Sequence, residues 1–130
     1  MRFFAAQQDS ASVVLARNLR KLQRLRVSDV GISAITLSEL DYGVRKSAKP
    51  VQNEIALAGF LAPLEVFPYD DLAAQEYGRL RAGLEEQGTP IGSMDMLIAA
   101  HALALGHILV TNNTAEFRRV SGLVVQNWAT

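Results

Sequence analysis

The chain has 130 residues, of which 49% are hydrophobic and 20% charged, and this length and apolar content predict a single globular domain over residues 1–130. Thirteen basic residues balance thirteen acidic residues, so no overall field draws the protein to nucleic acid or to an anionic membrane. Cysteine is absent, which excludes disulfides and thiolate metal sites, and no apolar run approaches the roughly 20 residues of a membrane span, so we expect a cytoplasmic protein.

The first half of the chain predicts three helices and a strand. Apolar residues recur at spacings of three and four between Ser10 and Arg26, together with five basic residues, and predict a basic amphipathic helix. The β-branched run "VGISAIT" predicts a strand, and "LSELDYGVRKSA" predicts a helix after it, with Thr36 as the cap. Pro50 suits the first turn of a further helix, "PVQNEIALAGFLA", which Pro63 ends.

The second half continues the alternation. "LEVFPY" predicts a strand, and Asp70 and Asp71 open a long helix after it. Ser93 is predicted to cap the apolar helix within "GSMDMLIAAHALALG", and "HILVT" predicts a buried strand. "NNTAEFRRV" predicts a turn with a short helix, and "LVVQNW" a final strand. Strands that alternate with helices indicate an α/β domain with a mostly parallel sheet.

Three acids stand where a parallel sheet forms its sites. Asp95 lies in the first turn of the apolar helix, Glu39 one turn into a helix that follows a strand, and Glu116 after the strand "HILVT". An acid in a first turn is ordinarily explained by the helix dipole, which is worth about 0.3–1 kcal/mol. In open parallel sheets, however, sites form at the carboxyl ends of strands, so all three acids could converge there. Gathered carboxylates repel one another, and Mg²⁺ or Mn²⁺ would relieve the repulsion.

Four blocks of the sequence resemble those of a known family: "ISAITLSELDYGVRKS", "FLAPLEVFPYD", "GTPIGSMDMLIAAHALALG" and "ILVTNNTAEFRRVSGLVVQNW". They look like successive blocks of the PIN-domain ribonucleases, and specifically of the VapC toxins of bacterial toxin–antitoxin pairs. The resemblance covers about three quarters of the chain, from Asp29 onward. It implies a PIN-like α/β/α sandwich, an acid cluster that binds Mg²⁺ or Mn²⁺, endonucleolytic cleavage of RNA, a homodimer and a partner antitoxin.

The resemblance also assigns site residues. It implies that Glu39 and Asp95 are catalytic metal ligands. Glu116 and Asn113 match the positions that complete the acidic site, and Thr111 supports them.

One departure from the family concerns the first strand. Family members begin with a strand that ends in "LDTN", whose aspartate is a principal metal ligand, and no "LDTN" occurs here. "RFFAAQQDSASV" looks like the helix after that strand, so the first strand is expected to be missing or replaced, through a late start or a natural truncation. If "RFFAA" filled the place, Asp9 could act as the missing ligand. We expect instead an open sheet, poor stability and little or no nuclease activity for residues 1–130 alone.

The basic N-terminal segment and the function both leave alternatives open. Residues 1–26 carry six basic residues against one acid, which suits either a solvated helix face or a phosphate-binding rim for RNA. The residues predicted for that rim are Arg17, Arg20, Lys21 and Arg24. The favoured function is a metal-dependent endoribonuclease toxin. The alternatives are a catalytically dead domain that engages the antitoxin or RNA, and a small α/β ligand-binding domain whose acids only cap helices.

Four further residues are predicted to be structural rather than catalytic. His101 lies six residues after Asp95, so it points to another side of the helix, and a buried or interfacial histidine is expected. Asp70 is expected to cap a helix. Asp41 is turned away from Glu39 on its helix, and Trp128 is expected to pack rather than to stack on RNA.

Overall fold

Strands and helices alternate along the chain in the computed structural model, which describes residues 3–5, 30–111 and 113–127. The described strands are β1 (Phe3–Ala5), β2 (Val30–Ser33), β3 (Glu65–Phe67), β4 (Ile108–Val110) and β5 (Val125–Gln126). The described helices are α2 (Ala34–Lys46), α3 (Pro50–Leu61), α4 (Asp71–Glu86), α5 (Ser93–Leu105) and α6 (Thr114–Phe117). The strands pair in parallel in the order β3-β2-β1-β4-β5, which confirms the predicted parallel sheet.

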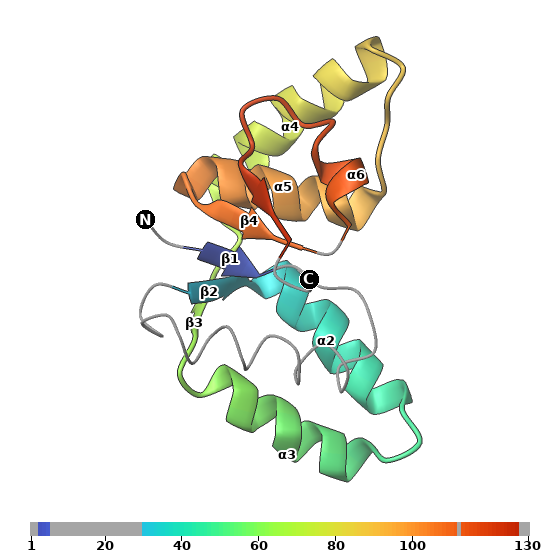
Figure 1. Cartoon of the computed structure of the whole chain (residues 1–130), viewed down its shortest axis with the longest axis vertical. Coiled ribbons are helices and arrows are strands. Elements are labelled where there is room, and N and C mark those ends of the chain that lie inside the picture. The colour runs from blue at the N-terminus through green and yellow to red at the C-terminus, as the bar shows by residue number, and fades with distance from the viewer. Residues whose placement is uncertain (1–2, 6–29, 112, 128–130) are drawn as a thin grey trace.

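Helices cover both faces of this sheet. Figure 1 shows α2 and α3 on one side, and α4, α5 and α6 on the other. Each side has its own hydrophobic core, a larger one that includes α4, α5 and β4, and a smaller one between β2, α2 and α3. This is the predicted α/β/α sandwich. Within the described part of the chain, no helix combines the length and the apolar character needed to cross a membrane.

The centre of the sheet corrects the expectation of an open sheet. β1 pairs in parallel with β2 on one side and with β4 on the other, with Phe4 opposite Gly31 and Leu109. Phe3–Ala5, the described part of "RFFAA", therefore supplies the central strand, the alternative that the sequence analysis disfavoured. Pairing on both sides satisfies the backbone groups of both neighbours, so the reason for expecting poor stability does not apply.

Phe4 shows why so short a strand holds its place. Its side chain is fully buried, and its ring lies 5.9 Å, centroid to centroid, from that of Phe67 at the end of β3. Gly31 makes room for this packing, because a Cβ there would lie 2.4 Å from Cε2 of Phe67. Burying a phenylalanine contributes about 1.5–3 kcal/mol, so one side chain anchors the three-residue strand.

The helix ends agree with the sequence in part. Pro50 begins α3 and Asp70 caps α4, where Oδ1 of Asp70 accepts a 3.0 Å hydrogen bond from the backbone N–H of Ala73. Two predicted caps are wrong. Ser33 rather than Thr36 caps α2, because β2 ends there and its hydroxyl accepts the N–H of Ile35 at 3.0 Å.

The second wrong cap belongs to α5. The cap position of α5 is Gly92, and Ser93 is the first helical residue. Within the described part of the chain, the cap residue of α5 has no side chain to accept a hydrogen bond, and the carboxyl group of Glu116 from α6 accepts the backbone N–H of Gly92 instead.

The sheet brings several strand ends to one edge. β1, β2 and β4 are parallel neighbours, so their carboxyl ends share an edge, where β2 leads directly into α2 and β4 leads toward α6. The RNA-binding residues predicted near the N-terminus lie outside the described residues, as do Asp9 and Trp128. Those residues are Arg17, Arg20, Lys21 and Arg24.

Candidate active site

Asp95 is a buried acid at the start of an apolar helix. It stands in the first turn of α5, with only 5% of its surface exposed, among buried neighbours such as Met96, Ile98 and Ala99. Burial removes most of the water that would stabilise a carboxylate charge. Compensation of the helix dipole is worth about 1 kcal/mol or less at an exposed position, so it is a weak reason to bury an acid here.

Glu116 reaches Asp95 from the other side of the site. Its Oε1 accepts a 2.7 Å hydrogen bond from the backbone N–H of Gly92, and its Oε2 accepts one of 2.6 Å from Nδ2 of Asn113. The backbone N–H of Asn113 in turn donates to Oγ1 of Thr111 at 3.1 Å. The loop between β4 and α6 is thereby joined to the first turn of α5, which brings Glu116 to Asp95.

The two carboxyl groups are in contact. A Cβ at Gly92 would lie 3.4 Å from Oδ2 of Asp95 and 3.7 Å from Oε1 of Glu116, so both carboxyl oxygens crowd one backbone position. Burial raises the pKa of Asp95 to about 7, and the hydrogen bond to Glu116, the charge of Glu116 and the charge of Glu39 add to the rise. The pKa of Glu116 is lowered, chiefly by the N–H of Gly92.

These opposite shifts describe one coupled pair. Two neighbouring carboxylates do not both ionise readily, so the raised pKa of Asp95 and the lowered pKa of Glu116 favour a proton on Asp95 beside an ionised Glu116. Below about pH 7 the pair therefore carries one negative charge, and above it the second charge must be stabilised by something else. A cation bound between the two would serve that purpose.

Glu39 is the third acid of the site. It is half-buried on α2, and burial raises the pKa of its carboxyl group. Its Oε2 is buried and, within the described part of the chain, has no hydrogen-bond partner, and the same holds for Oγ1 of Thr36 one turn earlier. Because the charge of Glu39 contributes to the raised pKa of Asp95, it acts on the same pair.

The donor set suits a hard divalent cation. All three acids offer oxygen atoms, one of which is buried and unbonded, and the Asp95–Glu116 pair shares a proton that a cation could replace. As the side chains stand, no three acids or histidines among the described residues are close enough to form a complete metal site. Two acids are already joined, and the third acts on them electrostatically.

Comparisons with known proteins identify the family of this chain. The PIN domain family matches residues 4–123. The tRNA(fMet)-specific endonuclease VapC of Shigella flexneri is 43% identical over 112 residues, covering 86% of this chain and 85% of the relative. Ribonuclease VapC2 of Rickettsia felis is 46% identical over 99 residues, covering 76% of this chain and 74% of the relative. The chain belongs to the VapC family of PIN-domain ribonucleases.

Solved VapC-family structures have the same fold. DNA-bound VapBC from Salmonella typhimurium has a chain with a TM-score of 0.87 and 38% identity, covering 98% of both chains. VapBC2 from Rickettsia felis, bound to a DNA fragment from its promoter, also gives a TM-score of 0.87 and 38% identity. The resemblance stated from the sequence is therefore confirmed, and it extends to the strand β1 that the sequence analysis took as missing.

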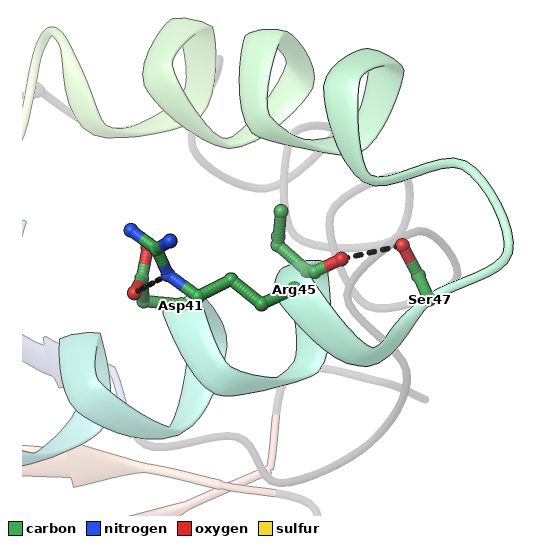
Figure 2. Close-up of polar contacts among 4 residues, drawn as sticks. Asp41, Arg45 and Ser47 are labelled. Carbon is green, nitrogen blue, oxygen red and sulfur yellow. Dashed lines mark hydrogen bonds and ion pairs between the residues drawn. The ribbon is translucent and has the colours of Figure 1, made fainter.

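Other acids of this VapC-family chain lie away from the site. Asp70 caps α4, as predicted, and Asp71 is the first residue of that helix. Figure 2 shows Asp41 paired with Arg45 along α2, with Nε of Arg45 2.7 Å from Oδ2 of Asp41. The figure also shows the hydroxyl of Ser47 donating to the backbone carbonyl oxygen of the residue three positions earlier, at the end of the same helix. The exclusion of Asp41 from the site thus agrees with its exposed ion pair.

Two polar partners of the site were not found from the sequence. The backbone N–H of Gly92 holds Glu116, and a backbone donor has no signal in residue type. The buried hydrogen bond between Ser33 and His101 joins two helices across 68 residues of sequence. Its one sequence signal is that His101 stands on a helix whose other faces are apolar.

Proposed function

We propose that this chain is an endoribonuclease toxin that cleaves RNA with a Mg²⁺ or Mn²⁺ ion held by Asp95, Glu116 and Glu39. The observation that carries the proposal is the buried carboxyl group of Asp95 with the half-buried Glu116 beside it, together with Glu39, whose Oε2 has no hydrogen-bond partner within the described part of the chain. Such a pair costs folding free energy through the burial of Asp95 and the charge of Glu116 beside it, although Glu116 also binds the backbone N–H of Gly92. It therefore suits binding of a cation better than it suits folding.

Each acid has a separate part in the proposed mechanism. A divalent cation, when bound, supplies an acidified water and neutralises charge on the scissile phosphate. Asp95 gives up its proton as the ion binds, which its pKa of about 7 makes easy near neutral pH. Glu116 stays ionised because the N–H of Gly92 and the amide of Asn113 hold it in place. Glu39, on α2, would be the third ligand of the cation.

The relatives suggest the substrate and the partner. The Shigella flexneri relative is named for tRNA(fMet), which makes initiator tRNA the first substrate to test. Solved neighbours are VapBC complexes, so we propose a cognate antitoxin as the partner of this chain. The homodimer is proposed from the family resemblance alone. We propose that the chain acts in the cytoplasm, because its proposed RNA substrate is there.

The test is cleavage of initiator tRNA by the purified chain. We expect site-specific cleavage with Mg²⁺ or Mn²⁺, none with EDTA, and a loss of at least a thousandfold in Asp95→Asn, since a neutral amide holds the cation poorly. Asp41→Asn is the matched control, because the same substitution at an exposed ion pair leaves the site intact. Cleavage that persists in EDTA and in Asp95→Asn would contradict the mechanism. A folded, inactive chain that binds its antitoxin would instead be a binding module.

A further inference from the structure

A buried hydrogen bond connects the two helices that carry Glu39 and Asp95. The hydroxyl oxygen of Ser33, which caps α2, lies 2.8 Å from Nδ1 of His101 on α5. Both side chains are inaccessible to solvent, with exposures of 0% for Ser33 and 1% for His101. The ring of His101 also makes edge contacts with those of Phe4 and Tyr69, at centroid distances of 5.0 and 5.4 Å. The imidazole is therefore held by one hydrogen bond and by two aromatic rings.

The direction of each hydrogen bond follows from the partners. The backbone of Pro68 can only accept, so the ring N–H of a neutral His101 that meets it leaves Nδ1 to accept the hydroxyl hydrogen of Ser33, whose oxygen also accepts the N–H of Ile35. The ring hydrogen then resides on Nε2 and goes to the backbone of Pro68, which has only a carbonyl oxygen to accept it. Burial lowers the pKa of His101, which keeps the ring neutral in this arrangement. One imidazole thus joins α5 to the start of α2 and to the end of β3.

The position of this hydrogen bond relates it to the acids. Ser33 lies six residues before Glu39, and His101 lies six residues after Asp95. At 1.5 Å per residue, each partner stands about 9 Å along its helix from the acid on that helix. A helix transmits displacement over such a length almost rigidly, so a shift at the hydrogen bond moves the carboxylates relative to each other.

We propose that His101, through Ser33, is a positioning residue that sets the spacing between the carboxylates of Glu39 and Asp95. The proposal rests on the proposed metal-dependent cleavage. Metal ligation tolerates errors of about 0.2 Å and functional groups about 0.5 Å, whereas one residue of sliding along a helix is 1.5 Å. A hydrogen bond is directional, so the contact between Ser33 and His101 restricts the sliding of α2 against α5 to less than apolar packing alone would. Groups that orient metal ligands typically contribute 10–100-fold in metal affinity or activity.

The central variant is His101→Leu. The leucine fills most of the space of the imidazole with an apolar side chain, and it removes the hydrogen bonds with Ser33 and with the backbone of Pro68. We expect its kcat on initiator tRNA to fall about 10–100-fold, with KM within about twofold of the unchanged protein. Mn²⁺ binding, followed by electron paramagnetic resonance without RNA, should weaken about tenfold. His107→Leu is the matched control. His107 lies just before β4, at the opposite end of that strand from the site, and its ring also contacts that of Phe4, at 6.0 Å. It should change neither kcat nor Mn²⁺ affinity.

Two further variants separate positioning from folding. Ser33→Gly removes the hydroxyl, and glycine is an acceptable helix cap, so α2 keeps its start. It should lower kcat as His101→Leu does, and the double variant should be no worse than either single one. His101→Asn, whose amide oxygen can accept the hydroxyl hydrogen of Ser33, should regain part of kcat and of Mn²⁺ affinity.

The outcomes distinguish this proposal from the function on which it rests. An unchanged protein that neither cleaves RNA nor binds Mn²⁺ would refute the function. Cleavage by the unchanged protein, with wild-type kcat and Mn²⁺ affinity in a folded His101→Leu variant, would overturn the positioning role alone. If His101→Leu does not fold, Ser33→Gly decides, and wild-type kcat in that variant overturns the proposal.

Discussion

The centre of the sheet and the acid site at its edge bury opposite kinds of groups. The centre buries apolar side chains and paired backbone, and the edge buries carboxyl groups. At the centre, Phe4, Ile32 and Leu109 are fully buried, and β1 is paired with a strand on each side. At the edge, Asp95 is almost as deeply buried but carries a strongly raised pKa, and a buried oxygen of Glu39 has no hydrogen-bond partner among the residues that the structure describes. The centre stabilises the folded state, and the buried acids at the edge destabilise it.

The contrast teaches where function lies in this molecule. A buried polar atom without a hydrogen bond costs about 1–3 kcal/mol, and a buried acid costs more unless it is neutralised. A domain whose total stability is about 5–15 kcal/mol retains such groups only where they serve another purpose. The following predictions test each side of the contrast.

The largest effect is expected at the centre. Phe4→Ala should lower the free energy of unfolding by about 3–5 kcal/mol, because it empties a fully buried site beside the rings of Phe67 and His101. Urea unfolding followed by circular dichroism measures this loss. Tyr42→Ala, at a side chain that is 62% exposed, should change stability by less than about 0.5 kcal/mol. Equal effects of the two variants would mean that β1 does not hold the centre of the sheet.

The next effect is the pH dependence of metal binding. A proton competes with the cation at Asp95, whose pKa is about 7, so the apparent Mn²⁺ dissociation constant should fall about tenfold between pH 6 and pH 8. Titration calorimetry at several pH values measures it, with Asp41→Asn expected to follow the unchanged protein. An affinity that is constant over this range would show that Asp95 binds the ion without releasing a proton.

A smaller effect is expected on thermal stability without metal. The folded-state pKa of Asp95 is raised above the value of 3.8 of an unperturbed aspartate, so this group lowers stability as pH rises from about 4 to about 7. Asp95→Asn removes that loss and should raise Tm by a few degrees at pH 8. The gain should shrink as pH falls below 7 and be absent below about 4. A lower Tm at pH 8 would mean that the carboxylate stabilises the fold.

The smallest effect concerns the support of Glu116. Asn113→Ala removes the 2.6 Å hydrogen bond to Oε2 of Glu116 but leaves the bond from the N–H of Gly92. Because one anchor remains, Mn²⁺ affinity should weaken only about two- to fivefold, as titration calorimetry at pH 8 can measure. A loss as large as that of Glu116→Gln would show that Asn113 itself binds the ion.

The sequence alone determined most helix positions, and it supplied the acids that we propose as metal ligands. Pro50 and Asp70 mark helix starts because the ring of proline and the carboxyl group of aspartate act on their own backbone within one turn. The prediction that Asp95 lies in a first turn is also confirmed. It could be made from the sequence because an acid directly before a run of small and apolar residues marks the start of a helix. The approach of Glu39, Asp95 and Glu116 was predicted from strand ends and remains a proposal as a metal site.

Only the tertiary structure decided the central strand and the contacts that hold the acids. A three-residue strand has too few residues to show a period, and β1 exists because β2 and β4 pair with it and Phe4 is buried. Ser33 and Thr36 are equally good caps in sequence, and the end of β2 selects Ser33. The N–H of Gly92 and the ring of His101 find their partners across 24 and 68 residues of chain. Such contacts form when packing brings distant segments together, and residue order by itself does not encode that distance.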